Sequence, residues 1–168
     1  MTAPFHLEAL ESHHDRSTFA SGEERLDHYF QTQVTQDIRR RIANCFVVVE
    51  VETRQVVAYY TIASASVSTP DLPSGDAKRL PRYPTMPTVR IGRLAVDRRY
   101  QGRGLGKALL ADAAMKVVAA APASFALLVD AKDDQAANFY KHHGFRPLGS
   151  LSNVLFLPLA TAEKILLA

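Results

Sequence analysis

Residues 94–110 read Leu-Ala-Val-Asp-Arg-Arg-Tyr-Gln-Gly-Arg-Gly-Leu-Gly-Lys-Ala-Leu-Leu. The stretch predicts the end of an apolar strand, then a basic glycine-rich turn, then a helix rich in alanine and leucine. Gly102, Gly104 and Gly106 lack the side chains that would keep an anion away from the backbone. The free amides of a helix N-terminus and the helix dipole both favour negative charge. We therefore expect this turn to hold a phosphate group.

The composition is that of an ordinary globular protein. The chain has 168 residues, of which 47% are hydrophobic and 22% charged, so we expect a single domain over residues 1–168. The single cysteine, Cys45, excludes an internal disulfide framework and lies in an apolar run that predicts a buried thiol. No signal peptide or membrane-spanning stretch is visible, and we expect a cytoplasmic protein with no membrane contact.

Positive charge is concentrated in one region of the chain, although the formal net charge is only +3. Between residues 78 and 107 the only acid is Asp97. The basic residues there are Lys78, Arg79, Arg82, Arg90, Arg93, Arg98, Arg99, Arg103 and Lys107. A second group is Arg39-Arg40-Arg41. A solvated basic face and a polyanionic partner such as RNA both explain this pattern.

The N-terminal half predicts a strand, a helix and a hairpin. Residues 5–10 form the first expected strand, and Ser21-Gly22-Glu23-Glu24 fits a capping box before a single helix that ends near Arg41. Residues 45–51 and 56–63 form an expected hairpin. Residues 64–88 contain five prolines (Pro70, Pro73, Pro81, Pro84, Pro87) and predict a long irregular connection.

The C-terminal half alternates strands and helices. We expect a strand over residues 89–96, a helix over 104–120 and a buried strand over 125–130. A short helix over 135–142, capped by Asp133 or Asp134, precedes a pair of strands over 145–148 and 153–157 and a last helix over 160–167. The fold class is therefore α/β, or an α+β sandwich.

Two common nucleotide-binding motifs do not fit the glycine turn. A Rossmann turn follows an N-terminal strand and has an acidic residue about 20 positions later, whereas this turn follows several predicted strands and precedes an alanine-rich region. A Walker motif needs Gly-Lys-Ser/Thr, and this chain has Gly106-Lys107-Ala108. Dinucleotide and nucleoside triphosphate ligands are therefore disfavoured.

The turn resembles the acetyl-CoA signature of the GNAT superfamily of N-acetyltransferases, Gln/Arg-x-x-Gly-x-Gly/Ala. The matching residues are 101–106, Gln-Gly-Arg-Gly-Leu-Gly, and residues 91–96 are similar to the strand that precedes this signature in the family. Residues 138–145, Asn-Phe-Tyr-Lys-His-His-Gly-Phe, are similar to a second segment that contacts CoA. The resemblance implies a mixed, mostly antiparallel central sheet of six or seven strands flanked by helices, with acetyl-CoA as co-substrate.

The resemblance also implies which residues contact acetyl-CoA. The pyrophosphate would lie on the amides of the turn and the pantetheine along residues 94–96, where a backbone amide near Leu94 would polarise the thioester carbonyl. An amine would then attack directly, with no covalent enzyme intermediate. The candidate cofactor-binding residues are Leu94, Ala95, Val96, Arg99, Gln101, Gly102, Arg103, Gly104, Leu105, Gly106, Lys107 and Asn138.

Tyr140 is the candidate general acid that protonates the departing thiolate, because a phenol with a pKa near 10 keeps its proton at neutral pH. The alternative is that Tyr140 is a core aromatic residue. The general base stays open, since Glu50, Asp130 and His142 also have purely structural interpretations, and a partly neutral α-amine needs no base. We expect no metal, because His13-His14 and His142-His143 are adjacent pairs with no acid-rich ligand set around them.

Within the superfamily, the chain resembles the acetyltransferase toxins of bacterial type II toxin–antitoxin systems. This resemblance rests on residues 19–26, 59–62, 91–106 and 139–145 and on the proline-rich connection. It implies acetylation of the α-amine of aminoacyl-tRNA, and hence inhibition of translation. It also implies a ribbon-helix-helix antitoxin, through which the complex would bind operator DNA.

Candidate tRNA contacts are Arg79, Arg90 and Arg93, since phosphate contacts supply most nucleic-acid affinity. Two alternatives remain: an N-acetyltransferase for a small amine or a protein N-terminus, and a non-catalytic acetyl-CoA-binding module. The sequence leaves open which aminoacyl-tRNA is preferred and whether the protein is a monomer or a homodimer.

Overall fold

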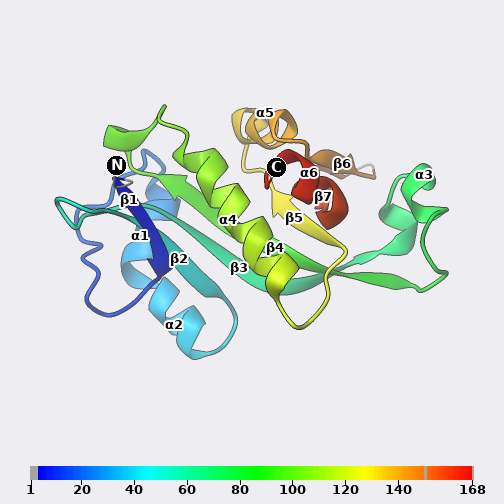
Figure 1. Cartoon of the computed structure of the whole chain (residues 1–168), viewed down its shortest axis with the longest axis horizontal. Coiled ribbons are helices and arrows are strands. Elements are labelled where there is room, and N and C mark those ends of the chain that lie inside the picture. The colour runs from blue at the N-terminus through cyan, green and yellow to red at the C-terminus, as the bar shows by residue number, and fades with distance from the viewer. Residues whose placement is uncertain (1–3, 150, 168) are drawn as a thin grey trace. The chain divides into compact units, whose positions relative to one another are not determined.

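The computed structural model describes residues 4–149 and 151–167, and within them seven strands form one sheet with the order β1-β2-β3-β4-β5-β7-β6 (Figure 1). The pairs β1–β2, β2–β3, β5–β7 and β6–β7 are antiparallel and β4–β5 is parallel. The strands are β1 Phe5–Ala9, β2 Asn44–Glu50, β3 Val56–Ser68, β4 Thr85–Val96, β5 Ala126–Asp130, β6 Arg146–Leu148 and β7 Leu151–Pro158. This confirms the expected mixed, mostly antiparallel sheet.

Helices flank this sheet, and two short 3-10 turns interrupt the connections (Figure 1). The helices are α1 Glu24–Thr32, α2 Val34–Arg39, α3 Ser74–Ala77, α4 Leu105–Ala119, α5 Asp134–His142 and α6 Leu159–Ile165; the 3-10 turns are η1 Thr69–Asp71 and η2 Arg98–Tyr100. Across residues 4–149 and 151–167, none of these helices combines the length and the apolar character needed to cross a bilayer.

The chain divides into two compact units. The first contains the residues up to Ala63 together with Gly92–Asp112, and the second contains Ser64–Ile91 and the residues from Ala113 onward. Strands β3 and β4 and helix α4 each contribute residues to both units. The expectation of one domain over residues 1–168 stays a prediction.

An aromatic cluster forms the core of the first unit. The rings of Phe30 and Tyr59 stack with centroids 4.1 Å apart, and Phe19 meets both edge-on. Val34 and Cys45 are buried beside them. Burial raises the pKa of the Cys45 thiol to about 12, so the thiol stays protonated and the prediction of a buried cysteine is confirmed.

The expected single helix with a capping box is wrong. The chain forms α1 and α2 instead. The two helices meet at Gln33, which stays in the right-handed helical region with φ −119°, and the next residue, Val34, is fully buried in the core. The N-cap of α1 is Glu23, whose side chain makes no cap hydrogen bond. Ser21 accepts a hydrogen bond from the amide of Glu23 at 3.1 Å and donates its hydroxyl to Asp27 at 2.7 Å, so the serine lies two residues before the N-cap.

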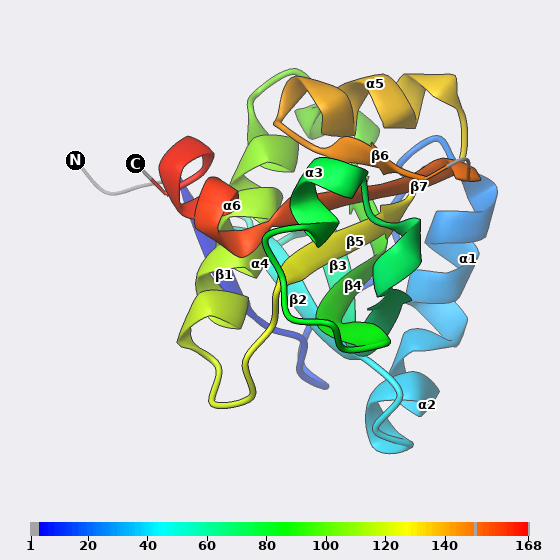
Figure 2. The same ribbon diagram turned by 90° about the vertical axis from the view of Figure 1, so that its right-hand side faces the viewer.

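The second unit has its own apolar core. In this unit β7 lies between β5 and β6 (Figure 2). Its buried residues are Val67, Leu72, Met86, Ala126, Leu128, Leu148 and Phe156. The irregular connection is shorter than predicted, because burial of Val67 and Met86 extends β3 to Ser68 and starts β4 at Thr85, and η1 and α3 lie between them. Arg146 of β6 pairs with Asp76 of α3 at 2.7 Å.

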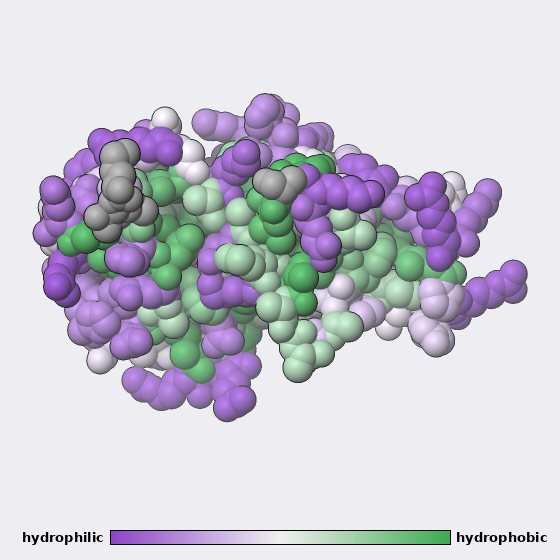
Figure 3. Space-filling model, in the orientation of Figure 1, coloured by the Kyte–Doolittle hydropathy of each residue, from purple (hydrophilic) through white to green (hydrophobic). Residues whose placement is uncertain are grey.

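The surface of the second unit carries several large hydrophobic side chains. The exposed ones among the described residues are Tyr83, Met115, Val118, Ile165 and Leu167. Met115 and Val118 belong to α4 and Ile165 belongs to α6, and Figure 3 shows hydrophobic atoms interspersed with hydrophilic ones over these helices.

Gly144, which follows α5, has a backbone conformation and surroundings that disfavour a side chain. Its φ is +98°, and a Cβ at this position would lie 2.7 Å from Cδ1 of Ile165. We expect Gly144→Ala to lower the free energy of unfolding by about 1–2 kcal/mol, measured by urea or thermal unfolding, since the residue loses its preferred backbone conformation and Ile165 must shift.

Gly75→Ala is the matched control. Gly75 lies in α3 and its φ is not positive, and a Cβ added there would have no atom within 4 Å, so this variant should unfold like the wild type. Equal stability of both variants would contradict the requirement for glycine at position 144.

Candidate active site

The glycine turn lies in the first unit between η2 and the start of α4. Gly102 and Gly104 have φ values of +78° and +80°, in the left-handed region that favours glycine. A Cβ on either residue would meet no atom within 4 Å. Glycine is therefore required here by the backbone conformation, and open space lies in front of the turn.

Asp97 holds the start of this turn in place. Its side chain is 1% exposed and accepts hydrogen bonds from the amide of Ala20 at 3.2 Å, the amide of Arg99 at 3.0 Å and Nε of Arg99 at 3.1 Å. Its own amide donates to the carbonyl of Val57 at 2.8 Å. Burial acts to raise the pKa of Asp97, but the hydrogen bonds from Arg99 and Ala20 outweigh it and the pKa is lowered.

The predicted cofactor residues of the turn fall into two groups. Arg99 pairs with Asp97, and the side-chain amide of Gln101 donates to the carbonyls of Ser21 and Val96, each at 2.9 Å. These two side chains stabilise the turn. Arg103 and Lys107 are exposed, and the Arg103 guanidinium lies 5.0 Å from the ring centre of Tyr100.

The predicted pantetheine segment, residues 94–96, forms the end of β4. Ala95 is buried in the aromatic core, while Leu94 and Val96 are partly buried. The parallel pairing of β4 with β5 covers Thr88–Ile91 and stops before Leu94.

Tyr140 lies in the second unit on α5. It is 8% exposed and packs against the rings of Phe139 and Phe145 at 5.2 and 5.4 Å. Burial raises the pKa of Tyr140 to about 12, so its hydroxyl keeps its proton throughout the physiological range. Asn138 is exposed on the same helix, and Asp133 is the N-cap, since its carboxylate accepts the amide of Ala136 at 2.8 Å.

Two of the candidate general bases are already engaged. Glu50 accepts hydrogen bonds from Thr53 at 2.7 Å and from the Tyr100 hydroxyl at 3.0 Å, and these bonds lower its pKa. Asp130 pairs with Arg90. His142 is exposed near the end of α5. No one of the three stands out as a base.

The three arginines predicted to contact tRNA have different surroundings. Arg79 is exposed, whereas Arg90 belongs to the pair with Asp130. Arg93 is partly buried and its guanidinium lies 3.5 Å from the ring centre of Tyr29, a cation–π contact.

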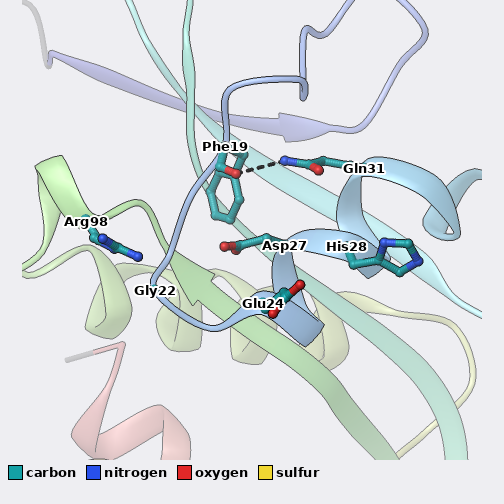
Figure 4. A pocket seen from close by; sticks show the side chains of 7 residues that line it. All are labelled: Phe19, Gly22, Glu24, Asp27, His28, Gln31 and Arg98. Carbon is teal, nitrogen blue, oxygen red and sulfur yellow. Dashed lines mark hydrogen bonds between the residues drawn. The ribbon is translucent and has the colours of Figure 1, made fainter.

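A cavity of about 480 Å³ beside the turn was not predicted from the sequence (Figure 4). It is lined by Phe19, Gly22, Glu24, Asp27, His28, Gln31 and Arg98. Figure 4 shows Arg98 on one side of the loop at Gly22 and the carboxylates of Glu24 and Asp27 on the other side. One wall of the cavity is therefore positively charged and the other wall is negatively charged. The sequence signal that was available is Arg98, which immediately precedes the turn.

The structure also places acids beside one histidine pair, which corrects the expectation for His13-His14. Potential ligand atoms of Glu8, His13 and His14 lie within 4.8 Å of one another. Nδ1 of His14 accepts the amide of Glu11 at 2.9 Å, so in the neutral ring Nε2 carries the proton and donates to Glu8 at 2.8 Å. Both ring nitrogens are therefore used by hydrogen bonds. The expectation that the protein binds no metal stays a prediction.

Comparison with known proteins places these features in context. Residues 43–147 match the family described as acetyltransferase (GNAT) domain. The chain is 38% identical over 133 residues to a tRNA-acetylating toxin of Mycobacterium tuberculosis (strain ATCC 25618 / H37Rv), and the aligned region covers 78% of each chain.

Two solved structures share the whole fold. The structure of AtaT complexed with acetyl-methionyl-tRNAfMet has a TM-score of 0.87 at 34% identity and covers 95% of this chain and 98% of that one. The second structure is a tyrosine-to-phenylalanine variant of AtaT bound to the C-terminus of the antitoxin AtaR and to acetyl-CoA. It has a TM-score of 0.80 at 29% identity, and the match covers 96% of this chain and 98% of that one.

Asp97→Asn tests whether this carboxylate holds the turn. We expect the substitution to lower the free energy of unfolding by about 2–3 kcal/mol at pH 7, since charge-assisted hydrogen bonds to a buried group are lost. Because the pKa is lowered in the folded state from its ordinary value of 3.8, the ionised carboxylate contributes fully above that pH, and its contribution is lost as the pH falls through the folded-state pKa.

Urea unfolding from pH 3 to pH 7 measures this effect. The difference between wild type and Asp97→Asn should shrink at the acid end, whereas the exposed Asp134→Asn should behave like the wild type throughout. A difference that does not change with pH would show that the carboxylate charge is not what stabilises the turn.

Proposed function

Because the chain belongs to the GNAT acetyltransferase family, we propose that it transfers the acetyl group of acetyl-CoA to the α-amine of aminoacyl-tRNA and so acts as a toxin that blocks translation. The observation that carries this proposal is the 38% identity to a tRNA-acetylating toxin across most of both chains. The solved complex of the similar protein AtaT with acetyl-methionyl-tRNAfMet supports the same substrate class.

The glycine turn is the proposed pyrophosphate site. Its left-handed glycines and the open space in front of Gly102 and Gly104 fit a ligand that must approach the backbone closely. Arg103 and Lys107 are exposed cations near it without an ion-pair partner among the described residues, and they would neutralise phosphate charge. Arg99 and Gln101 would act by stabilising the turn, since their side chains are bound to Asp97 and to the carbonyls of Ser21 and Val96.

The proposed reaction is direct transfer. The amine nitrogen attacks the thioester carbonyl, a C–N bond forms, and the C–S bond breaks as the thiolate leaves. The backbone near Leu94 would donate to the carbonyl oxygen as it gains negative charge. Tyr140 would give its hydroxyl proton to the thiolate, and the attacking amine would release a proton to solvent. The raised pKa of Tyr140 suits this role, because the acid must be protonated before each turnover.

The proposed partners follow from the toxin relatives. A ribbon-helix-helix antitoxin would neutralise the protein, and their complex would bind operator DNA; AtaT has been solved with the C-terminus of the antitoxin AtaR. Among the three predicted tRNA contacts, Arg79 is the exposed one, so its side chain is accessible to RNA. We propose action in the cytoplasm, where aminoacyl-tRNA is used, and leave monomer and homodimer open.

Tyr140→Phe tests the proposed general acid. We expect kcat for acetylation of charged tRNA to fall by about 10²–10⁴-fold while the KM for acetyl-CoA is unchanged, because only the proton donor is lost. Tyr83→Phe, at an exposed tyrosine, is the control and should retain full activity. Transfer of labelled acetyl groups to a set of charged tRNAs measures both.

Two results would count against the proposal. If wild type acetylates no charged tRNA but does acetylate small amines or peptide N-termini, the acceptor class is wrong. If it binds acetyl-CoA and transfers acetyl to nothing, the protein is a binding module.

Gly104→Ala tests the pyrophosphate site. A side chain at φ +80° is disfavoured, so the turn should relax and move its amides. We expect the dissociation constant of acetyl-CoA, measured by calorimetry, to rise about tenfold or more, which corresponds to about 1.4 kcal/mol. Gly75→Ala should bind like the wild type. Unchanged affinity in Gly104→Ala would place the pyrophosphate elsewhere.

A further inference from the structure

The last turn of α2 ends in a Schellman motif that has an arginine at the position where glycine is usual. The amide of Ile42 donates to the carbonyl of Asp37 at 2.9 Å, and the amide of Arg41 donates to the carbonyl of Ile38 at 3.0 Å. Arg41 has a φ of +62°, in the left-handed region. A side chain with a Cβ is disfavoured there, so this arginine lowers stability relative to glycine.

Arg41 completes a run of three exposed arginines, which we call the arginine turn: Arg39, Arg40 and Arg41. Within residues 4–149 and 151–167, none of the three forms an ion pair with a carboxylate. Hydrophilic atoms project where the chain leaves α2 (Figures 1 and 3). Three adjacent guanidinium groups without partners are suited to a polyanion.

Strand register places the arginine turn far from the glycine turn within the first unit. Asn44, three residues after Arg41, pairs with Ile62, whereas Val49 at the other end of β2 pairs with Val56. The glycine turn lies at that second end, since the amide of Asp97 binds the carbonyl of Val57. Seven strand residues span about 20 Å at about 3.3 Å each. The arginine turn therefore does not serve the pyrophosphate of the acetyl donor.

Arg93 lies at the same end as the arginine turn. Its amide donates to Oγ1 of Thr61 at 3.1 Å, next to Ile62 in β3. Its guanidinium lies on the ring of Tyr29, whose hydroxyl donates to Asp37 of α2 at 2.7 Å. Tyr29 and Asp37 thus join a predicted tRNA contact to the helix that carries the arginine turn.

We propose that the arginine turn Arg39–Arg41 is a docking point for the phosphate backbone of the tRNA substrate. The inference rests on the proposed function, since it assigns a surface to that substrate. Guanidinium groups bind phosphate oxygens in bidentate fashion and without regard to sequence, so the contact would add affinity and salt dependence to binding. It lies at the end of the first unit opposite the glycine turn, and so leaves that turn free for the donor.

Arg41→Gly gives a test in which stability and binding change in opposite directions. Glycine suits the left-handed position, so the melting temperature should rise by about 2–4 °C. The loss of one cation should weaken tRNA binding about three- to tenfold at low salt and reduce the slope of log K against log salt by about 0.7–0.9. Thermal unfolding measures the melting temperature. Fluorescence anisotropy with charged tRNA measures the affinity and its salt slope, in the Tyr140→Phe background so that the tRNA is not acetylated.

Arg54→Gly is the matched control. Arg54 is also exposed, has a φ of +58° and follows the opposite end of β2. The control removes the same charge and relieves the same backbone conformation, so it should gain similar stability with unchanged tRNA affinity. Arg41→Lys, which keeps the charge, should retain most of the binding.

The outcomes separate this inference from the proposed function. If wild type acetylates charged tRNA but Arg41→Gly and Arg54→Gly bind it with equal affinity and equal salt slope, the docking point is wrong while the function stands. If Arg41→Gly loses affinity for an antitoxin but not for tRNA, the surface belongs to a protein partner and the inference is overturned. If no charged tRNA is acetylated, the proposed function itself fails.

Discussion

The buried carboxylate of Asp97 is the interaction on which the glycine turn depends. The carboxylate joins the end of β4 to Ala20 and Arg99, and the backbone amide of the same residue joins it to Val57. Removing a charged group from water is costly unless it is hydrogen-bonded, and here the bonds outweigh the cost and lower its pKa. The glycines after it can then keep left-handed conformations with open space in front of them.

Positive charge in the first unit has several different uses. Arg99 is bound to Asp97 and Arg93 lies on Tyr29, so both are part of the folded framework. Arg103 and Lys107 remain exposed near the glycine turn, and Arg39–Arg41 remain exposed at the far end of β2. A count of basic residues therefore overstates the charge available to a ligand, because tertiary contacts decide which guanidinium groups stay free.

Predictions from local signals succeeded where the signal and the structure are both local. The strand that ends at Val96, the Asp133 cap and the strand around residues 126–130 follow from residue type and spacing. The single helix to Arg41 failed because burial of Val34 in the aromatic core accompanies a break at Gln33, a packing effect that helical spacing does not contain. The prediction of a capping box failed because the hydroxyl of Ser21 donates to Asp27 and the N-cap of α1 is Glu23 instead of the serine.

The sequence by itself determined the family, the glycine turn and Tyr140 as a candidate acid, since each depends on residue identity over a short stretch. Only the tertiary structure decided the partners of Arg90, Arg93, Arg99 and His14, and the cavity beside Arg98. The physical reason is that ion pairs, cation–π contacts and burial join residues that are brought together by strand register and core packing, and a single sequence carries no direct record of those distances.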